Sequence, residues 1–271
     1  MLTKIYIDKP LFESTSLPPL TNQIKIIPIT SITYIINDIQ NDSNILCHSV
    51  YISQNLESLL EVIKLGVCCI GYDTDNSLFN PLLKNIILDT TSLTPLYINS
   101  LISHHNGRPA VIYEDNKLVI RELTFTDFDI LYAMFNSDSP KSLVFLDGYM
   151  TDSYDVEKEK FNAYISNQYT FYGYGQYCII LKAFNTIIGQ CGFYEDNAGN
   201  TCLSYYINSQ YRRLGIAYKS CYMLLEYITK EICISSIYAH INEDNIPSIN
   251  LINKLGFIHT SKDTYIYQKD C

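Results

Sequence analysis

The sequence predicts an α/β (α+β) protein in two parts: a small α/β domain, then a mixed, mostly antiparallel sheet flanked by helices. Three patterns carry this prediction. A strand–helix–strand pattern occupies the first part, three strands joined by short polar turns occupy residues 176–207, and a long helical pattern begins at residue 216. A length of 271 residues suits one large or two ordinary domains.

Composition narrows the class of protein. The chain is 47% hydrophobic and 17% charged, which favours a packed core over disorder. A net charge of −9 argues against a general nucleic-acid binder, because phosphate contacts need a basic surface, and it tolerates a cationic or amine substrate.

Cysteine spacing and hydropathy indicate the compartment. The nine cysteines form no C-x-x-C pair, so neither a zinc site nor a disulfide framework is indicated, and no metal is expected. No apolar run approaches the ~20 residues of a membrane span, and the first residues lack the features of a signal peptide. We therefore expect a cytoplasmic protein with reduced thiols, with no membrane or nucleic-acid partner, as a monomer or a homodimer.

The first domain is placed at residues 1–109. Residues 24–29 and 44–48 are predicted as strands. Asn55 is expected to cap an amphipathic helix that ends at Gly66, and residues 67–72 follow as a buried strand. This order predicts a βαβ unit in a parallel sheet.

Asp73 and Asp75 follow that strand in a D-x-D-x-S pattern, which resembles the nucleophile loop of haloacid-dehalogenase-type phosphatases. Such enzymes also need a lysine and a distal acidic pair that hold magnesium, for which little chain remains before the second part. A degenerate relative of that fold and a solvated acidic loop are the alternatives, and a working phosphatase is the weakest. We assign this domain no chemistry.

The boundary is drawn through two polar turns, at 104–109 and 114–117. Residues 110–113 between them fit either a short strand or an ordered linker, and we place a linker at 110–116 and the second domain at 117–271. The elements expected there are a strand at 118–123, helices at 124–135 and 154–169, strands at 176–182, 186–193 and 201–207, a helix at 216–230, a strand at 236–241, a helix at 246–255, and strands at 257–259 and 264–267.

The most informative stretch is 212–217, Arg-Arg-Leu-Gly-Ile-Ala, between a strand and a helix. The first N–H groups of a helix have no intrahelical partner, and the helix dipole favours an anion there. Gly215 and Ala217 leave the backbone accessible, and Arg212 and Arg213 add positive charge. The pattern predicts a pyrophosphate site, although by itself it also fits a turn in which glycine relieves strain.

Three motifs stand in order along the second domain. Arg121 and Asp127 fit "l-x-i-R-x-l-x-x-x-D", residues 205–217 fit "G-Y-w-i…R/Q-x-x-G-x-G/A", and residues 245–257 fit "N-x-x-S…K-L-G-F". With these motifs the second domain resembles the GCN5-related N-acetyltransferase (GNAT) family, in its ribosomal-protein N-terminal acetyltransferase branch.

The resemblance implies a site for acetyl-CoA, as a co-substrate, in a split between two central strands, one of them 201–207. It implies that the backbone of Tyr206, Ile207 and Asn208 binds the pantetheine and that Asn245 contacts the cofactor. It places Ser248 near the thioester sulfur as the one catalytic candidate. The residues implied at the pyrophosphate are Arg212, Arg213, Leu214, Gly215, Ile216 and Ala217. Asn245 also fits a helix N-cap, and Ser248 a residue without a role.

The activity implied is acetyl transfer to a primary amine, either a small molecule or a protein N-terminus, by direct attack in a ternary complex. Such an enzyme must orient the reactants, remove the ammonium proton and supply a hydrogen-bond donor to the carbonyl oxygen. In this family a backbone N–H is the donor.

Three positions depart from the family pattern. Cys202 stands where a glutamate is frequent, Ser204 where glycine is usual, and Ile252 where many relatives carry a tyrosine. The general base is therefore unassigned, and a water chain ending on Glu195, Asp196 or a tyrosine is one substitute. These departures motivate an alternative, an acyl-CoA-binding sensor or regulatory module with little or no turnover.

Residues 167–175 alternate aromatic and small residues. They fit two interpretations equally: rigid packing at the end of a helix, or a wall of the acceptor cleft, since aromatic faces attract cations.

Overall fold

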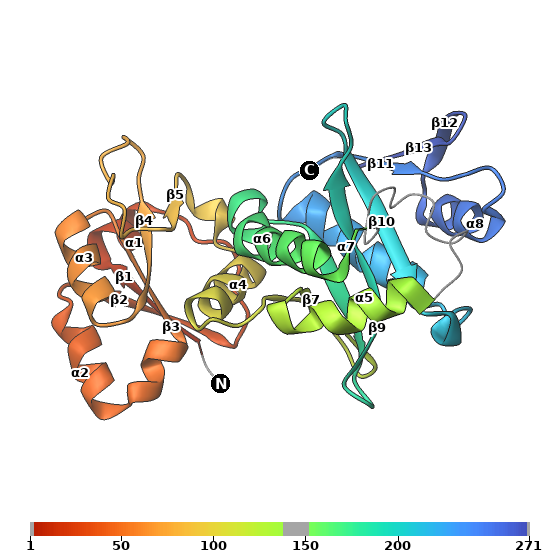
Figure 1. Ribbon diagram of the computed structural model, residues 1–271. Helices are drawn as coiled ribbons and strands as arrows, with labels where there is room; N and C mark the ends of the chain where they lie inside the picture. The colour runs from red at the N-terminus through yellow and green to blue at the C-terminus, as the bar shows by residue number, and fades with distance from the viewer. Residues whose placement is uncertain (1–2, 138–151, 270–271) are drawn as a thin grey trace. The chain divides into compact units, whose positions relative to one another are not determined.

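The computed structural model describes residues 3–137 and 152–269, so the outermost residues of the two predicted domains lie outside it (Figure 1). The chain divides into two compact units, Met1–Ala110 and Val111–Cys271. The predicted α/β (α+β) class is confirmed.

The first unit is built on a parallel five-stranded sheet with the order β2-β1-β3-β4-β5, which is the order of one type of doubly wound fold. The strands are β1 (Thr3–Asp8), β2 (Ile24–Ile29), β3 (Ser49–Ser53), β4 (Cys68–Tyr72) and β5 (Ile86–Ile87). The helical segments are α1 (Lys9–Ser14), α2 (Thr33–Asn41), η1 (Ser43–Cys47), α3 (Leu56–Lys64), η2 (Thr90–Ser92) and α4 (Pro95–His105).

Helices cover both faces of this sheet. Ile5 and Ile7 of β1 belong to an apolar cluster with Ile98 of α4, whereas Tyr6, between them, packs in a second cluster with Leu59 of α3. Successive side chains of a strand point to opposite faces, so the two clusters are the two sides of a three-layer unit.

Two local predictions for this unit met different outcomes. The Asn55 cap is confirmed, because its Oδ1 accepts the N–H of Ser58 at 2.9 Å. The strand predicted at 44–48 is wrong. Those residues form most of the 3₁₀ helix η1, whose start is capped by Asp42, and the strand is β3.

Asp73 stabilises the loop after β4. Its Oδ1 accepts the N–H of Ser77 at 2.9 Å, and its Oδ2 accepts the N–H of Leu78 at 3.1 Å. These bonds hold the buried carboxylate of Asp73 within its own loop.

The second unit contains an eight-stranded sheet with the order β12-β13-β11-β10-β9-β8-β7-β6. Its strands are β6 (Val111–Glu114), β7 (Leu118–Glu122), β8 (Gln176–Leu181), β9 (Thr186–Glu195), β10 (Thr201–Ile207), β11 (Ser236–His240), β12 (Ile258–Ser261) and β13 (Thr264–Gln268). Its helical segments are η3 (Phe125–Asp127), α5 (Phe128–Ser137), α6 (Tyr154–Tyr172), η5 (Ser209–Tyr211), α7 (Ile216–Lys230) and α8 (Ile246–Leu255). β6 is the alternative that the sequence left open against a linker at 110–116, and it pairs with β7.

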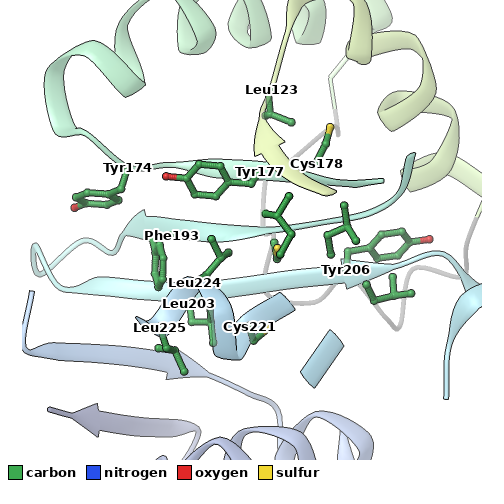
Figure 2. Close-up of a cluster of buried hydrophobic side chains, with 14 of the residues drawn as sticks. Leu123, Tyr174, Tyr177, Cys178, Phe193, Leu203, Tyr206, Cys221, Leu224 and Leu225 are labelled. Carbon is green, nitrogen blue, oxygen red and sulfur yellow. The ribbon is translucent and has the colours of Figure 1, made fainter. Parts of the chain in front are cut away.

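Every neighbouring pair in this sheet is antiparallel except β10 with β11. Helices flank both faces. Leu203 of β10 packs near Cys221, Leu224 and Leu225 of α7 (Figure 2). On the opposite face the ring of Tyr206 lies 4.9 Å, between centroids, from that of Phe135 in α5. The core thus fixes β10 from both sides.

The first of the three matched motifs builds a corner between β7 and α5. Arg121 donates to both carboxylate oxygens of Asp127, at 2.7 and 2.8 Å, and Asp127 Oδ2 also accepts the N–H of Thr124. Burial raises the pKa of Asp127, but the bonds from Arg121 and Thr124 outweigh burial and leave that pKa below its ordinary value. These motif residues therefore have a structural role here.

The aromatic segment divides between the two interpretations. Tyr169 is buried, accepts the N–H of Leu123 and donates to the carbonyl of Gln176, and Tyr174 packs on Phe193. These two rings serve packing at the end of α6. Phe171 is 84% exposed, and its ring centre lies 5.8 Å from that of Tyr172.

Candidate functional site

The parallel pairing between β10 and β11 is short. Cys202 with Tyr238 is the one partner pair joining the two strands within the described residues, and β10 continues for five residues beyond it. A parallel ladder that stops after one pair leaves backbone groups of β10 without a strand neighbour on that side. This is where the resemblance implies a split for acetyl-CoA.

Among the three positions predicted to bind the pantetheine, one N–H faces the open side. The N–H of Asn208 donates to the carbonyl of Ile188 in β9 at 2.9 Å, so it is already used. Backbone groups of alternate residues point to opposite neighbours, which turns Tyr206 toward β9 as well and Ile207 away from it. The carbonyl of Ile207 accordingly accepts Arg212 Nε at 2.8 Å rather than a group of β9. Of the backbone groups predicted to bind the pantetheine at Tyr206, Ile207 and Asn208, the N–H of Ile207 is the one N–H directed away from β9.

The loop after β10 turns sharply into α7. Both Arg213 (φ 64°) and Gly215 (φ 75°) adopt the left-handed region, which is uncommon for a residue other than glycine. Gly215 is the N-cap of α7 and has no side chain to accept a first-turn N–H, and the first turn contains no acidic residue. A Cβ built on Gly215 meets no atom within 4 Å, so the space beside the helix start is open.

The two arginines of this loop have different surroundings. Arg212 folds back, with its guanidinium 5.5 Å from the centre of the Tyr206 ring and its Nε bonded to Ile207. Arg213 and Leu214 are exposed at the turn, and Ile216 and Ala217 in the first turn of α7 are half-buried. Arg212 shapes the loop, and Arg213 is the cation positioned at its surface.

Asn245 caps α8, because its Oδ1 accepts the N–H of Ser248 at 3.3 Å. Ser248 lies beside the phenol of Tyr205, whose oxygen is buried without a hydrogen bond of good geometry among the described residues. Burial raises the pKa of this phenol above its ordinary value, so it stays protonated. The structure thus brings Ser248 and a buried O–H donor together on one face of β10.

The three residues that depart from the family pattern, Cys202, Ser204 and Ile252, have well-defined surroundings. Ile252 is fully buried in the core. Ser204 exchanges hydrogen bonds with Gln176, at 2.8 and 3.1 Å, and Gln190 donates to Gln176 at 3.1 Å. Cys202 has no exposed surface. None of these three side chains replaces the missing glutamate or tyrosine directly.

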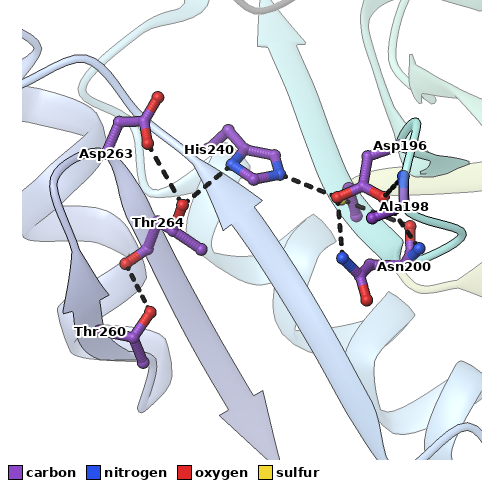
Figure 3. Close-up of polar contacts among 8 residues, drawn as sticks. Asp196, Ala198, Asn200, His240, Thr260, Asp263 and Thr264 are labelled. Carbon is purple, nitrogen blue, oxygen red and sulfur yellow. Dashed lines mark hydrogen bonds and ion pairs between the residues drawn. The ribbon is translucent and has the colours of Figure 1, made fainter.

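A histidine at the end of β11 completes the site (Figure 3). His240 Nε2 lies 3.2 Å from Asp196 Oδ2, and its Nδ1 lies 3.3 Å from Thr264 Oγ1. Asp196 Oδ1 accepts the N–H groups of Ala198 and Asn200, each at 2.9 Å. Since Cys202 pairs with Tyr238, His240 lies on β11 two residues beyond the join, at the start of the split.

Sequence reasoning named Asp196 as one possible end of a proton path but missed His240. Burial favours a higher pKa for Asp196, but bonds from Asn200, His240 and Ala198 outweigh burial and hold the pKa well below its ordinary value. The carboxylate is therefore ionised beside the imidazole. The one sequence signal was a histidine at a strand end, five residues before Asn245.

These features together define an acyltransferase of the acetyl-CoA type: a sheet opened at one parallel join, an uncapped helix start beyond it, and a histidine–carboxylate pair beside the opening. The family profile described as "Acetyltransferase (GNAT) domain" matches residues 117–258, just over half of the chain. The chain belongs to the GNAT acetyltransferase family, whose members use acetyl-CoA, and is an acetyltransferase.

Individual proteins are similar over the same part. The "Uncharacterized N-acetyltransferase YnaD" of Bacillus subtilis (strain 168) is 28% identical over 141 residues, which are 52% of this chain and 78% of that protein. The "Uncharacterized N-acetyltransferase p20" of Bacillus licheniformis is 26% identical over 144 residues, 52% and 79% of the two chains. The solved RimL ribosomal L7/L12 alpha-N-protein acetyltransferase in complex with coenzyme A is 16% identical, with a TM-score of 0.48, over 59% of this chain and 97% of that one.

Over residues 3–137 and 152–269, no helix combines the length and the apolar character needed to cross a bilayer.

Proposed function

We propose that this protein transfers the acetyl group of acetyl-CoA to a primary amine, on a small molecule or a protein N-terminus, by direct attack in a ternary complex. We place the activity in residues 117–271 and assign no chemistry to 1–109. The observation that carries the proposal is the continuity of the site: β10 leaves β11 after one pair and leads through Gly215 into an uncapped helix start.

The residues present fit acetyl-CoA. The open space at Gly215 and the first-turn N–H groups of α7 suit a pyrophosphate, with Arg213 adding charge. The N–H of Ile207 faces the side where a pantetheine chain would run along β10. We keep Asn245 as a cofactor contact through its amide, in addition to its cap. When bound, acetyl-CoA supplies the acetyl group as a thioester.

His240 is the group we propose to remove the ammonium proton. It lies at the start of the split, and Asp196 faces its Nε2 with a carboxylate that stabilises the imidazolium once the proton is taken. The base that the family pattern left unassigned is thus supplied by β11 and the β9–β10 turn instead of by position 202.

Tyr205 is the group we propose to protonate the departing thiol. Its O–H is buried, remains protonated and lies beside Ser248, where the resemblance implies the sulfur. Ser248 then positions this phenol. In this proposal Tyr205, positioned by Ser248, takes the role of the general-acid tyrosine that many relatives carry at the position of Ile252.

The activity is tested by incubating the chain with acetyl-CoA and a panel of small primary amines and short peptides, with detection of free thiol. Amino-blocked versions of the same peptides are the matched control. Thiol release with free amines alone supports the transferase. Tight acetyl-CoA binding without release on any amine contradicts the proposal and favours the acyl-CoA sensor.

The role of His240 is tested with His240→Gln, for which kcat should fall at least roughly a hundredfold while the KM for acetyl-CoA stays unchanged. His259→Gln, at an exposed histidine on β12, is the control and should retain full activity. An unchanged kcat would remove His240 from the mechanism.

A further inference from the structure

We propose that Asp196, Cys202 and His240 form an inhibitory binding site for a zinc-class divalent cation. The binding site stands on its own geometry, and only its inhibitory effect rests on the proposed function. The three residues come from the β9–β10 turn, β10 and the end of β11, so only the fold brings them together.

The two donor distances from Asp196 match the ligand spacing of a tetrahedral site. Asp196 Oδ2 lies 3.2 Å from His240 Nε2 and 3.7 Å from Cys202 Sγ, and all three donor atoms lie within 4.8 Å of one another. Zinc bonds of about 2.0–2.2 Å to nitrogen or oxygen and about 2.3 Å to sulfur give ligand–ligand edges of roughly 3.3–3.7 Å. A cation can therefore enter with small side-chain adjustments.

Neighbouring groups orient two of the three ligands. Thr264 Oγ1 lies at hydrogen-bond distance from Nδ1 of His240, which leaves Nε2 to bind a metal. The N–H groups of Ala198 and Asn200 hold Asp196 Oδ1, and Asn200 Nδ2 donates to Oδ2 at 3.0 Å, which fixes Oδ2 beside the other two ligands. Such outer contacts are what a metal-binding histidine and carboxylate usually have.

The ligand set selects the kind of cation. A thiolate with an imidazole and one carboxylate suits Zn²⁺ or Co²⁺, whereas Mg²⁺ and Ca²⁺ prefer oxygen ligands. Asp196 and His240 keep 17% and 26% of their side-chain surface exposed, so an ion has access, and the buried Cys202 closes the inner side. Three protein ligands leave the fourth position to water.

Metal binding at this site should release a proton, which makes the affinity depend on pH. Burial and the neighbouring Asp196 raise the pKa of the Cys202 thiol to about 12, so the thiol is protonated before metal arrives. Formation of the metal–sulfur bond breaks the S–H bond and releases one proton to solvent. Affinity should therefore increase with pH.

When a metal binds Nε2 of His240, the one remaining ring proton lies on Nδ1, so the imidazole has no lone pair left to take the ammonium proton. Acetyl transfer should stop when the site fills and should resume after chelation. A divalent cation thereby acts as a reversible inhibitor at the base itself.

The test uses the full chain after chelator treatment. Titration with Co²⁺ should give a near-ultraviolet thiolate-to-cobalt band and tetrahedral visible bands that saturate at one ion per chain. Cys202→Ser should lose the thiolate band and bind at least about tenfold more weakly, whereas Cys233→Ser, at an exposed thiol, should match wild type. Asp196→Asn provides a second variant if the serine exchange impairs folding. An unchanged band in Cys202→Ser, or no saturable binding by the wild-type chain, overturns the site.

Inhibition is measured separately. Zinc at saturating concentration should abolish thiol release by the wild-type chain, while Cys202→Ser should keep its activity and resist the same concentration. Equal inhibition of both chains overturns the inhibitory role. The cobalt spectra test the site even if no amine is acetylated, so failure of the proposed function remains distinguishable.

Discussion

Helices α7 and α8 both begin beside the split in the sheet, yet their starts differ. Asn245 covers the start of α8 with its own side chain, which accepts the N–H of Ser248. Gly215 leaves the start of α7 bare and in the left-handed region, with open space around it. A chain that caps one helix and not its neighbour leaves first-turn N–H groups available to a ligand at one place.

A third helix start, at the segment that leads into α5, is capped by more contacts than the start of α8. Thr124, Asp127 and Arg121 form a network there in which the ion pair is buried, with 18% and 5% of the two side-chain surfaces exposed. If the capped helix starts serve stability, substitutions there should change the free energy of unfolding. If the uncapped start of α7 serves binding, substitutions there should change the affinity for acetyl-CoA.

The largest effect is expected at the closed start of α5. Asp127→Asn leaves Arg121 buried without a counter-charge and should lower the free energy of unfolding by about 3 kcal/mol. Asp129→Asn, two residues on and exposed, is the control and should change it little. Denaturant unfolding checks both, and equal effects would contradict the structural role of the Arg121 motif.

The same ion pair predicts a pH dependence. Because the pKa of Asp127 is lowered in the folded state, its contribution is present above the ordinary carboxyl pKa of about 4 and is lost as the pH falls through the folded-state value. Unfolding midpoints measured from pH 7 downward should fall less steeply in Asp127→Asn than in wild type. Parallel curves would show that Asp127 does not carry this dependence.

At the open start of α7, Gly215→Asp should weaken acetyl-CoA binding roughly 30-fold, or about 2 kcal/mol, with little loss of stability. The carboxylate repels the pyrophosphate and accepts the N–H groups that the ligand needs, and aspartate tolerates positive φ better than most residues. Gly107→Asp, at another exposed left-handed glycine, is the control. Calorimetry should separate the two, and equal affinity would show that this helix start does not bind the cofactor.

Arg213→Glu should weaken acetyl-CoA binding about tenfold, or about 1.4 kcal/mol, and less at high salt because the charge is exposed. Arg108→Glu makes the same charge change in the first unit and should leave binding intact. If both variants lose affinity alike, net charge rather than position is responsible.

The smallest effect on stability is expected at capping asparagines. Asn245→Ala and Asn55→Ala each remove one cap and should each cost about 1 kcal/mol of stability. Only Asn245→Ala should also raise the KM for acetyl-CoA. If the KM is unchanged, Asn245 is a cap and nothing more.

The fold of the second unit could be predicted from the sequence because its signals are local. Periodicity and turn residues mark the meander, and Gly215 and Gly256 mark helix ends. The first unit was harder. β1 was missed, and the apolar run at 44–48 was predicted as a strand although the strand is the following Ser-Val-Tyr-Ile-Ser, since an apolar run alone does not distinguish a strand from a helical turn.

The residues of the candidate site also differ in how far the sequence could predict them. The loop at 212–217 could be found because its residues are consecutive. The approach of Asp196, in the β9–β10 turn, to His240, 44 residues further on, depends on the parallel pairing of β10 with β11, which local patterns do not encode. Nor could the sequence show that the N–H of Asn208 is already bonded to Ile188.

The most direct test of the central claim, that the open start of α7 binds the pyrophosphate, compares two ligands by calorimetry. Acetyl-CoA contains the pyrophosphate and acetylpantetheine does not. Wild type should bind acetyl-CoA more tightly, and Gly215→Asp should remove most of this preference while leaving the affinity for acetylpantetheine unchanged. If Gly215→Asp weakens both ligands equally, or neither, the loop does not hold the pyrophosphate and the claim is contradicted.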